Sequence, residues 1–152
     1  MSSEVNMPNA ISNFFMKAIV NSPLHPLLGS HFAVITFEGR KSGKRYSTPI
    51  NVTRDGDTFT AVSLRNRNWW RSLRGGRLAQ LRVVGKQYIV CGEVLEEHGA
   101  VVTGLAQYFK QNPGYARYFG VSLAPNGQPS GEDLVRAADE RVVIRLRLAT
   151  AA

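Results

Sequence analysis

A short segment at positions 39 to 45 combines the residue types that bind phosphate groups. Its two glycines, Gly39 and Gly43, permit positive φ angles, and successive backbone N–H groups in such a turn can form a concave anion site. The side chains add two cations and a hydroxyl donor: Arg40, Lys41 and Ser42. Charge-assisted hydrogen bonds from these groups suit phosphate oxygens. The spacing is not that of a Walker loop, and basic hairpin turns are common, so the segment alone indicates an anion site only weakly.

Two adjacent tryptophans, Trp69 and Trp70, lie in an arginine-rich segment at positions 63 to 76, which begins with Ser63 and includes Arg65. Neighbouring helix positions point about 100° apart, so we expect one indole to enter the core and the other to line a groove. An indole face suits stacking on a planar ring, and arginines suit anions. Burial of both rings is an equally good interpretation, because tryptophan is largely buried on average.

A third segment carries tyrosines at positions 108, 115 and 118. Their rings could wall a substrate pocket, and a phenol can act as a proton or hydrogen-bond donor. For any one of these tyrosines, a structural role is the commoner one.

Residues for other chemistry are scattered. The three histidines, His25, His31 and His98, show neither metal-ligand spacing nor the order of a Ser-His-acid triad, and Cys91 is the only cysteine. No paired carboxylates lie near the basic segments. We therefore expect no metal site and no hydrolase, and infer that any difficult chemistry is carried by a cofactor.

The positive charge is concentrated in one region. The chain carries a formal net charge of +8, and residues 40 to 86 hold 12 of its 19 basic residues but only two of its 11 acidic ones, a local charge of +10. Such a field raises the local concentration of anionic ligands. Nucleic acid, acidic lipid and a phosphorylated cofactor are all candidates.

The elements that position these segments are short. An amphipathic helix is expected at 9–21, since apolar residues recur at i, i+3, i+4, i+7 and i+8, and a linker follows it to residue 29. Helices are also expected at 97–111 and 130–138. Alternating or apolar runs predict strands at 31–38, 46–54, 58–64, 78–84, 87–96 and 141–148.

Five hairpin-linked strands, a helical excursion and a returning last strand predict a mainly β protein with flanking helices (α+β), built as a small closed or partly open barrel over residues 30–152. No run of about 18 apolar residues exists, so no membrane-spanning helix is expected. The N-terminus does not resemble a signal peptide, and we expect a cytoplasmic protein.

Several motifs together resemble the deazaflavin (coenzyme F420)-dependent nitroreductases, also called the F420-dependent quinone reductase family. The resemblance rests on Thr36-Phe37-Glu38-Gly39-Arg40-Lys41-Ser42-Gly43, Ser47-Thr48-Pro49-Ile50, Arg54-Asp55-Gly56-Asp57 and Asn68-Trp69-Trp70-Arg71-Ser72-Leu73. It covers most of the chain, from Phe32 to the last strand. It implies a split β-barrel related to flavin-binding oxidases and a reductase that transfers hydride from the reduced deazaflavin to a quinone, nitro or other activated unsaturated substrate.

The resemblance also implies a set of site residues. The cofactor would contact Arg40, Lys41, Ser42, Gly43, Thr48, Pro49, Ser63, Arg65, Trp69 and Trp70, and Tyr118 would act on the substrate side as the catalytic residue. Many members carry a basic residue where this chain has Tyr46, while Arg45, just ahead of it, would point to the opposite face of the strand.

Alternatives remain open. A split barrel that binds FMN or a lipid-like ligand without deazaflavin turnover would share the fold. A basic nucleic-acid-binding module is less favoured, because the aromatic residues are few and paired. The expected partner is a small hydrophobic substrate rather than nucleic acid. A homodimer and a weak membrane-surface contact through the N-terminal helix are further options, although that helix has only Lys17 as a basic residue.

Overall fold

The computed structural model describes residues 31–149 of the 152-residue chain. The predicted amphipathic helix at 9–21, and with it the proposed N-terminal unit 1–29, lies outside the described residues.

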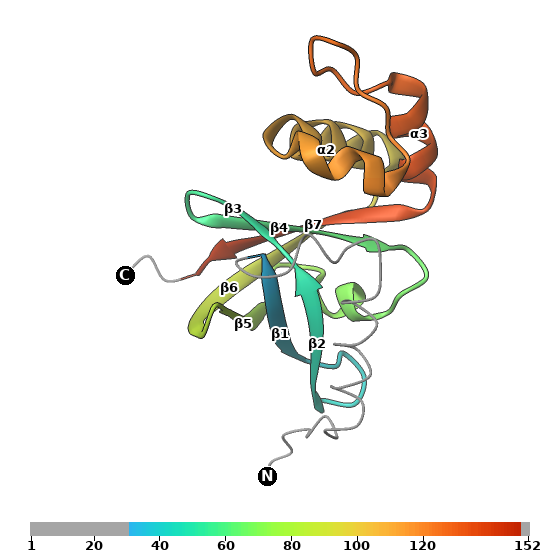
Figure 1. Cartoon of the computed structure of the whole chain (residues 1–152). Helices are drawn as coiled ribbons and strands as arrows, with labels where there is room; N and C mark the ends of the chain where they lie inside the picture. The colour runs from blue at the N-terminus through green and yellow to red at the C-terminus, as the bar shows by residue number, and fades with distance from the viewer. Residues whose placement is uncertain (1–30, 150–152) are drawn as a thin grey trace.

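Seven antiparallel strands form one curled sheet in the order β2-β1-β5-β6-β7-β4-β3 (Figure 1). The predicted strands at 58–64 and 141–148 have the expected bounds, and the ends of the others differ by at most one residue, with the strand at 46–54 divided in two. The strands are β1 (Phe32–Glu38), β2 (Arg45–Asn51), β3 (Thr53–Asp55), β4 (Thr58–Leu64), β5 (Leu78–Val83), β6 (Lys86–Leu95) and β7 (Arg141–Leu148).

The sheet curls because its two edge strands, β2 and β3, follow one another in the chain with a single residue between them. The predicted strand at 46–54 is interrupted at Val52, so that β2 pairs with β1 at one edge while β3 pairs with β4 at the other. Val52 is 2% exposed, and its N–H donates to the carbonyl of His31. This bend brings β2 back towards β4 without a shared ladder, and the barrel wall is therefore interrupted between these two strands.

The prediction of five consecutive hairpin-linked strands was wrong at one connection. β4 and β5 do not pair; β4 pairs with β7 along its whole length, and β7 also pairs with β6. The returning last strand is thus inserted between β4 and β6 rather than added at an edge. The segment between β4 and β5 holds the short 3₁₀ helix η2 (Trp69–Leu73), in line with the helical connection expected there.

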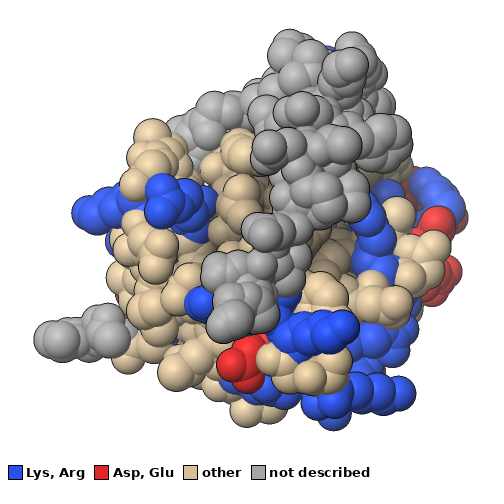
Figure 2. Space-filling view, turned by 90° about the horizontal axis from the view of Figure 1, so that it is seen from below, with Lys and Arg blue, Asp and Glu red and all other residues tan. Residues whose placement is uncertain are grey.

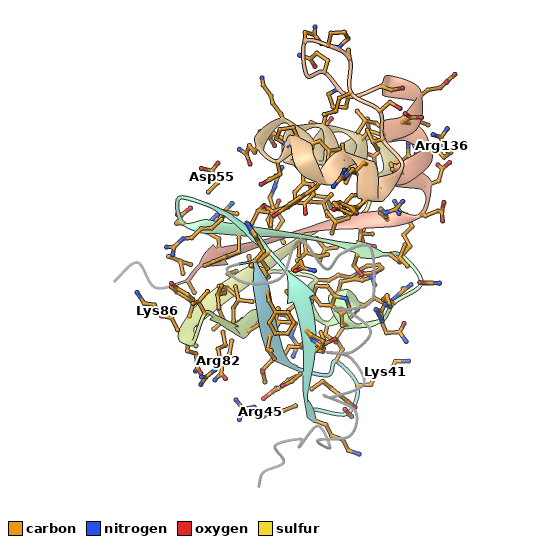
Figure 3. The ribbon with its side chains drawn as sticks, viewed as in Figure 1. Lys41, Arg45, Asp55, Arg82, Lys86 and Arg136 are labelled. Atoms are coloured by element: carbon orange, nitrogen blue, oxygen red, sulfur yellow. The ribbon has the colours of Figure 1, made fainter. Side chains whose placement is uncertain are left out.

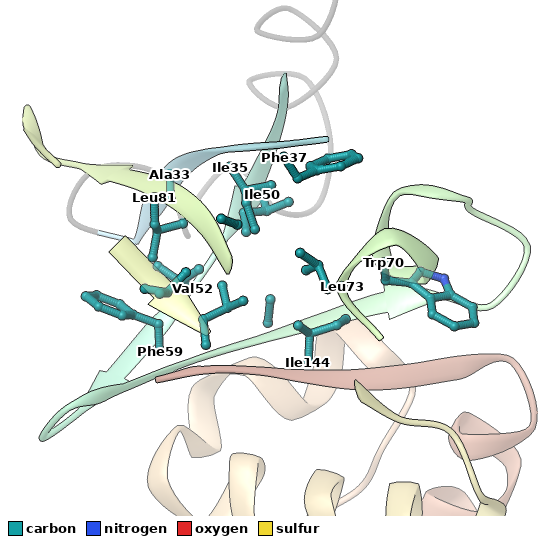
Figure 4. Packing of buried hydrophobic residues seen from close by; sticks show 14 of the residues in the cluster. Ala33, Ile35, Phe37, Ile50, Val52, Phe59, Trp70, Leu73, Leu81 and Ile144 are labelled. Atoms are coloured by element: carbon teal, nitrogen blue, oxygen red, sulfur yellow. The ribbon is translucent and has the colours of Figure 1, made fainter. Parts of the chain in front are cut away.

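The barrel core consists of the inward-facing residues of the strands together with the two buried residues of η2. Figure 4 shows η2 at one end of this core, where the Leu73 side chain lies in the same cluster as Ile35 and Ile144. All three of these side chains are fully buried.

A second core lies between the sheet and a helical layer (Figure 1). This layer comprises α2 (His98–Gln111), the 3₁₀ helix η3 (Pro113–Phe119) and α3 (Gly131–Asp139). The side chain of Glu97 caps α2 by accepting from the Ala100 N–H, and the side chain of Ser130 caps α3 by accepting from the Asp133 N–H. The cap at Ser130 was predicted from the sequence. The helix η3 was not predicted: Pro113 follows the end of α2, but it also starts the next turn, where a missing N–H has no consequence.

Gly92 on β6 allows η2 to pack against the barrel. A Cβ at this position would lie 2.9 Å from Leu73 Cβ and 3.3 Å from the Leu73 carbonyl oxygen. Because that contact involves backbone, a methyl group there must displace η2. The absence of a side chain at position 92 therefore helps to set the position of η2 and of the two tryptophans that it carries.

We expect Gly92→Ala to lower the free energy of unfolding by about 1–3 kcal/mol, the usual range for overpacking a core contact. Gly114→Ala is the matched control, because a Cβ at Gly114 meets nothing within 4 Å. Urea denaturation of both variants measures the difference. Equal stability of the two variants would mean that η2 is free to move away from β6.

Candidate functional site

The turn between β1 and β2 closes through its two glycines. The N–H of Gly39 donates to the Lys44 carbonyl at 2.7 Å, and the N–H of Gly43 donates to the Gly39 carbonyl at 3.1 Å. Gly43 has a φ of +71°, a conformation that disfavours residues with a side chain. Within residues 31–149, the N–H groups of Arg40, Lys41 and Ser42 have no hydrogen-bond acceptor. The turn therefore offers three backbone donors beside two cationic side chains.

Tyr46 supports this turn from the strand that follows it. Its hydroxyl lies 3.2 Å from Ser42 Oγ, which also accepts from the N–H of Lys44 at 3.1 Å. A Cβ at Gly39 would lie 2.7 Å from Tyr46 Cε2, so the ring packs directly on the glycine. The phenol of Tyr46 thus shapes the turn and adds no charge to it.

The basic residues near this end of the barrel are mostly not neutralised. Among the described residues from Arg40 to Arg77, only Arg74 has a carboxylate within 4 Å. Figure 2 views the molecule from below, from the side where the β1–β2 turn lies, and shows many Lys and Arg side chains with few acidic ones. Like charges held together in this way favour an anionic ligand.

The two tryptophans have different environments, as the helical spacing predicted. Trp70 is 2% exposed in the barrel core, and its Nε1 donates to the Leu64 carbonyl at 3.2 Å. Trp69 is half-buried, and its Nε1 donates to Ser63 Oγ at 3.1 Å. The hydrogen bond fixes the plane of the Trp69 ring and leaves part of that ring accessible for stacking.

Arg65 and Arg74 hold the η2 segment in place. The Arg65 guanidinium donates to the Glu96 backbone carbonyl at 2.7 Å and to the Ala138 carbonyl at 3.4 Å. Arg74 makes a bidentate pair with the Glu96 carboxylate, at 2.6 and 2.7 Å. This hydrogen bond holds the pKa of the Glu96 carboxyl below its ordinary value and raises the pKa of Arg74. The guanidinium of Arg65 is thus directed at the protein backbone.

The strand register places Thr48 and Ser63 on the inner face of the barrel. Thr48 lies opposite Ile35, and Ser63 lies opposite Val142, both of which are fully buried. Residues directly opposite in an antiparallel ladder share a face. Pro49 points to the outer face, on a strand at the sheet edge where a missing N–H is tolerated. Thr48 and Ser63 therefore flank the interruption between β2 and β4.

Tyr118 lies in η3, in the helical layer. Its hydroxyl accepts from Arg117 at 3.1 Å, and the same guanidinium lies over its ring at 5.0 Å. Among residues 31–149 no hydrogen bond or ring contact joins Tyr118 to Trp69 or to the basic turn. The structure thus brings together Ser63 and Trp69, and groups Arg40, Lys41, Ser42 and Gly43 in one turn, but shows no contact between these residues and Tyr118.

Two supporting residues were missed as members of the site. Tyr46 has the same strand parity as Thr48, which is a signal readable from the sequence. Glu96 pairs with Arg74 from 22 positions away, and only the packing of η2 on β6 reveals it.

Within residues 31–149 no group of three or more His, Cys, Asp or Glu side chains is arranged to hold a metal ion. None of the helices described in this range is long and apolar enough to cross a membrane.

No family model and no curated protein sequence matches the chain. Solved structures do. A proposed 5-nitroimidazole antibiotic resistance protein from Bacteroides thetaiotaomicron is 11% identical, with a TM-score of 0.54 over 83% of this chain and 78% of that one. The flavocytochrome Anf3 from Azotobacter vinelandii is 13% identical, with a TM-score of 0.52 over 81% and 60%. An F420 reductase is 17% identical, with a TM-score of 0.48 over 82% and 90%.

The likeness to the Bacteroides protein and to the flavocytochrome, together with the curled seven-stranded sheet and its helical layer, identifies the fold as a split β-barrel of the FMN-binding type, mainly β with flanking helices. The predicted fold class is confirmed.

Proposed function

We propose that this chain binds a phosphorylated flavin-type cofactor at the basic end of the barrel, with coenzyme F420 as the preferred form and FMN as the alternative. The observation that carries the proposal is the combination of a half-exposed indole, fixed by Ser63, with a turn whose cations lack acidic partners in residues 31–149. A planar ring and a phosphate are the two parts of such a cofactor that these groups would bind.

The donors available fit this group. The N–H groups of residues 40–42 and the side chains of Arg40 and Lys41 supply hydrogen bonds and positive charge for phosphate or carboxylate oxygens. Ser42 and Gly43 would hold the turn in the shape that presents them. Trp69 would stack on the ring system, with Thr48 and Pro49 on the strand beside it.

Arg65 and Trp70 support the site in this proposal by anchoring the segment that carries Trp69. Trp70 is enclosed by the core and by the guanidinium groups of Arg71 and Arg74, at 4.7 and 5.1 Å from its ring. This packing holds Trp69 in one position before a ligand arrives, which lowers the entropy lost on binding.

The activity proposed is reduction of a small hydrophobic quinone, nitro or other activated unsaturated compound. The reduced deazaflavin, when bound, supplies the hydride, and the chain orients the two reactants and stabilises charge. Tyr118 is assigned to the substrate side, where its phenol would donate a hydrogen bond to the oxygen that gains negative charge. A flavocytochrome of the same fold supports the choice of a flavin-type ligand.

The test is fluorescence titration of the purified full chain with oxidised F420, with FMN and with riboflavin, which lacks the phosphate. We expect F420 to bind most tightly, and riboflavin to bind at least about tenfold more weakly than FMN, since one charge-assisted hydrogen bond is worth about 1.5–3 kcal/mol. Consumption of reduced F420 in the presence of a naphthoquinone then measures turnover.

Each alternative gives a different result. Preference for FMN, with no oxidation of reduced F420, would support the flavin-binding barrel without deazaflavin turnover. Saturable binding of a fatty acid but of none of the three cofactors would support a lipid-like ligand. Oligonucleotide binding with a salt slope that reports several phosphates would favour the nucleic-acid module.

A further inference from the structure

A cavity lies away from the basic turn, between the C-terminal half of α2 and the outer face of the sheet. Its volume is about 400 Å³, within the range of small-molecule sites. In Figure 3, Asp55 lies beside α2, on the other side of the barrel from Lys41 and Arg45. The lining is largely polar, and its principal groups come from the β3–β4 hairpin, β7 and α2: Asp55, Asp57, Thr60, Gln107, Arg145 and Arg147.

The cavity exists because the outer face of the sheet changes character along its strands. Val62 and Val143, paired across β4 and β7, pack against the helical layer. Further along the same ladder the pairs are Thr60 with Arg145 and Thr58 with Arg147, which are polar. The helix therefore lies on an apolar surface at one end and over a polar one at the other.

Two hydrogen bonds hold α2 above the polar part of the sheet. Arg145 donates to Gln107 Oε1 at 3.1 Å, and Gln111 Nε2 donates to Asp55 Oδ2 at 3.1 Å. One bond reaches β7 and the other reaches β3. They fix the opening between the helix and the sheet at both sides.

The charged groups of the cavity are arranged in two opposite pairs. Asp55 ends β3 and Asp57 lies in the turn before β4, while Arg145 and Arg147 lie on β7. The strand β4 separates Asp55 from β7, whereas the Asp57 carbonyl accepts from the Leu148 N–H at 2.8 Å and so lies directly beside β7. Since neighbouring strands are about 4.8 Å apart, the backbone of Asp55 lies about 10 Å from that of the arginine strand, and the backbone of Asp57 lies about half as far from it. Within residues 31–149 neither aspartate has a cationic partner within 4 Å, and Arg147 approaches only Glu93, at 3.9 Å.

Tyr108 adds a neutral polar group to the lining. It is 5% exposed, and burial raises the pKa of its phenol well above the ordinary value, so the hydroxyl stays protonated. In the described part of the chain this hydroxyl has no hydrogen-bond partner, while its ring packs between Phe109, Tyr115 and Phe119. This hydroxyl is not among the fully buried atoms that lack a partner, and Tyr108 lines the cavity, so a ligand or water there can hydrogen-bond to it.

We propose that this cavity binds a small zwitterion of the α-amino-acid class, with its carboxylate towards Arg145 and Arg147 and its ammonium towards Asp55 and Asp57. The two aspartates and two arginines sum to no net charge, so a ligand of one sign gains from one pair and is repelled by the other. A zwitterion interacts favourably with both pairs. The glutamines and Tyr108 supply hydrogen bonds to the remainder of the ligand.

The experiment uses ¹H–¹⁵N correlation spectra of the full chain, titrated with L-glutamine as the probe. N-acetyl-L-glutamine removes the ammonium charge and L-glutamine amide removes the carboxylate, at nearly unchanged size. We expect L-glutamine to shift the amides of residues 55–60, 104–111 and 145–147 with a Kd of about 1 mM or tighter, and each blocked probe to bind at least about tenfold more weakly.

Three variants locate the binding. Asp55→Asn and Arg147→Gln should each weaken L-glutamine binding about tenfold, while Arg82→Gln, on the exposed β5 surface, should leave it unchanged. The same spectra check that each variant is folded. The proposal is overturned if L-glutamine shifts no amide around the cavity at about ten times the expected Kd, if the blocked probes bind equally well, if inorganic phosphate binds there more tightly, or if Asp55→Asn keeps full affinity.

Discussion

Replacing both Arg40 and Lys41 by alanine is expected to weaken the binding of oxidised F420 about 100-fold. Each charge-assisted contact to a phosphate is worth about 1.5–3 kcal/mol, and tenfold in affinity corresponds to about 1.4 kcal/mol. Both side chains are exposed, so solvent screening places the expected effect at the lower end of this range. Fluorescence titration at low ionic strength measures it.

The matched control removes the same charge from a different place. Arg82 and Lys86 lie on the β5–β6 hairpin, and their double replacement by alanine also lowers the net charge by two. If the effect at the basic turn is local, this control changes affinity only slightly, and added salt narrows the difference between the two variants. Equal loss of affinity in both double variants would assign F420 binding to the general field of the protein and contradict a site at the turn.

Local patterns predicted the strands well because each strand faces a core on at least one side. The alternation in Thr58–Leu64 and in Arg141–Leu148 was sufficient to give the bounds of β4 and β7. The interruption at Val52 could not be predicted in this way, because it depends on β2 and β3 joining opposite edges of the sheet. Topology of this kind is decided by pairing between strands that are far apart in the sequence, and a local pattern carries no information about that pairing.

The two candidate sites differ in how much of them is local. The basic turn lies within seven consecutive residues, so its composition was readable directly from the sequence. The cavity under α2 joins Asp55 to Gln111 and Arg145 to Gln107, across 56 and 38 positions. It arises only because β7 is inserted beside β4, and the aspartates and arginines that line it carry no recognisable motif.

The adjacent tryptophans give the second large effect, and it separates packing from ligand binding. We expect Trp70→Ala to lower the free energy of unfolding by about 3–5 kcal/mol, because it removes a fully buried aromatic ring and leaves a cavity. The loss also frees the Leu64 carbonyl and removes the surface on which Arg71 and Arg74 pack. Against a typical total of about 5–15 kcal/mol, such a loss is about a fifth or more of the stability.

Trp69→Ala is the matched comparison, since it removes an identical side chain one position away. Trp69 is half-buried at the edge of the same core, so about 1–2 kcal/mol of stability is expected to be lost. Its larger effect should be on F420 affinity, because the stacking surface held by Ser63 is gone. Chemical denaturation and fluorescence titration of each variant measure the free energy of unfolding and the F420 affinity separately.

Trp70→Phe, which keeps an aromatic ring in the core, replaces Trp70→Ala in both measurements if Trp70→Ala does not fold. If Trp69→Ala loses stability as Trp70→Ala does while retaining full affinity for F420, Trp69 is a core residue, and the flavin-type ring does not stack at this end of the barrel.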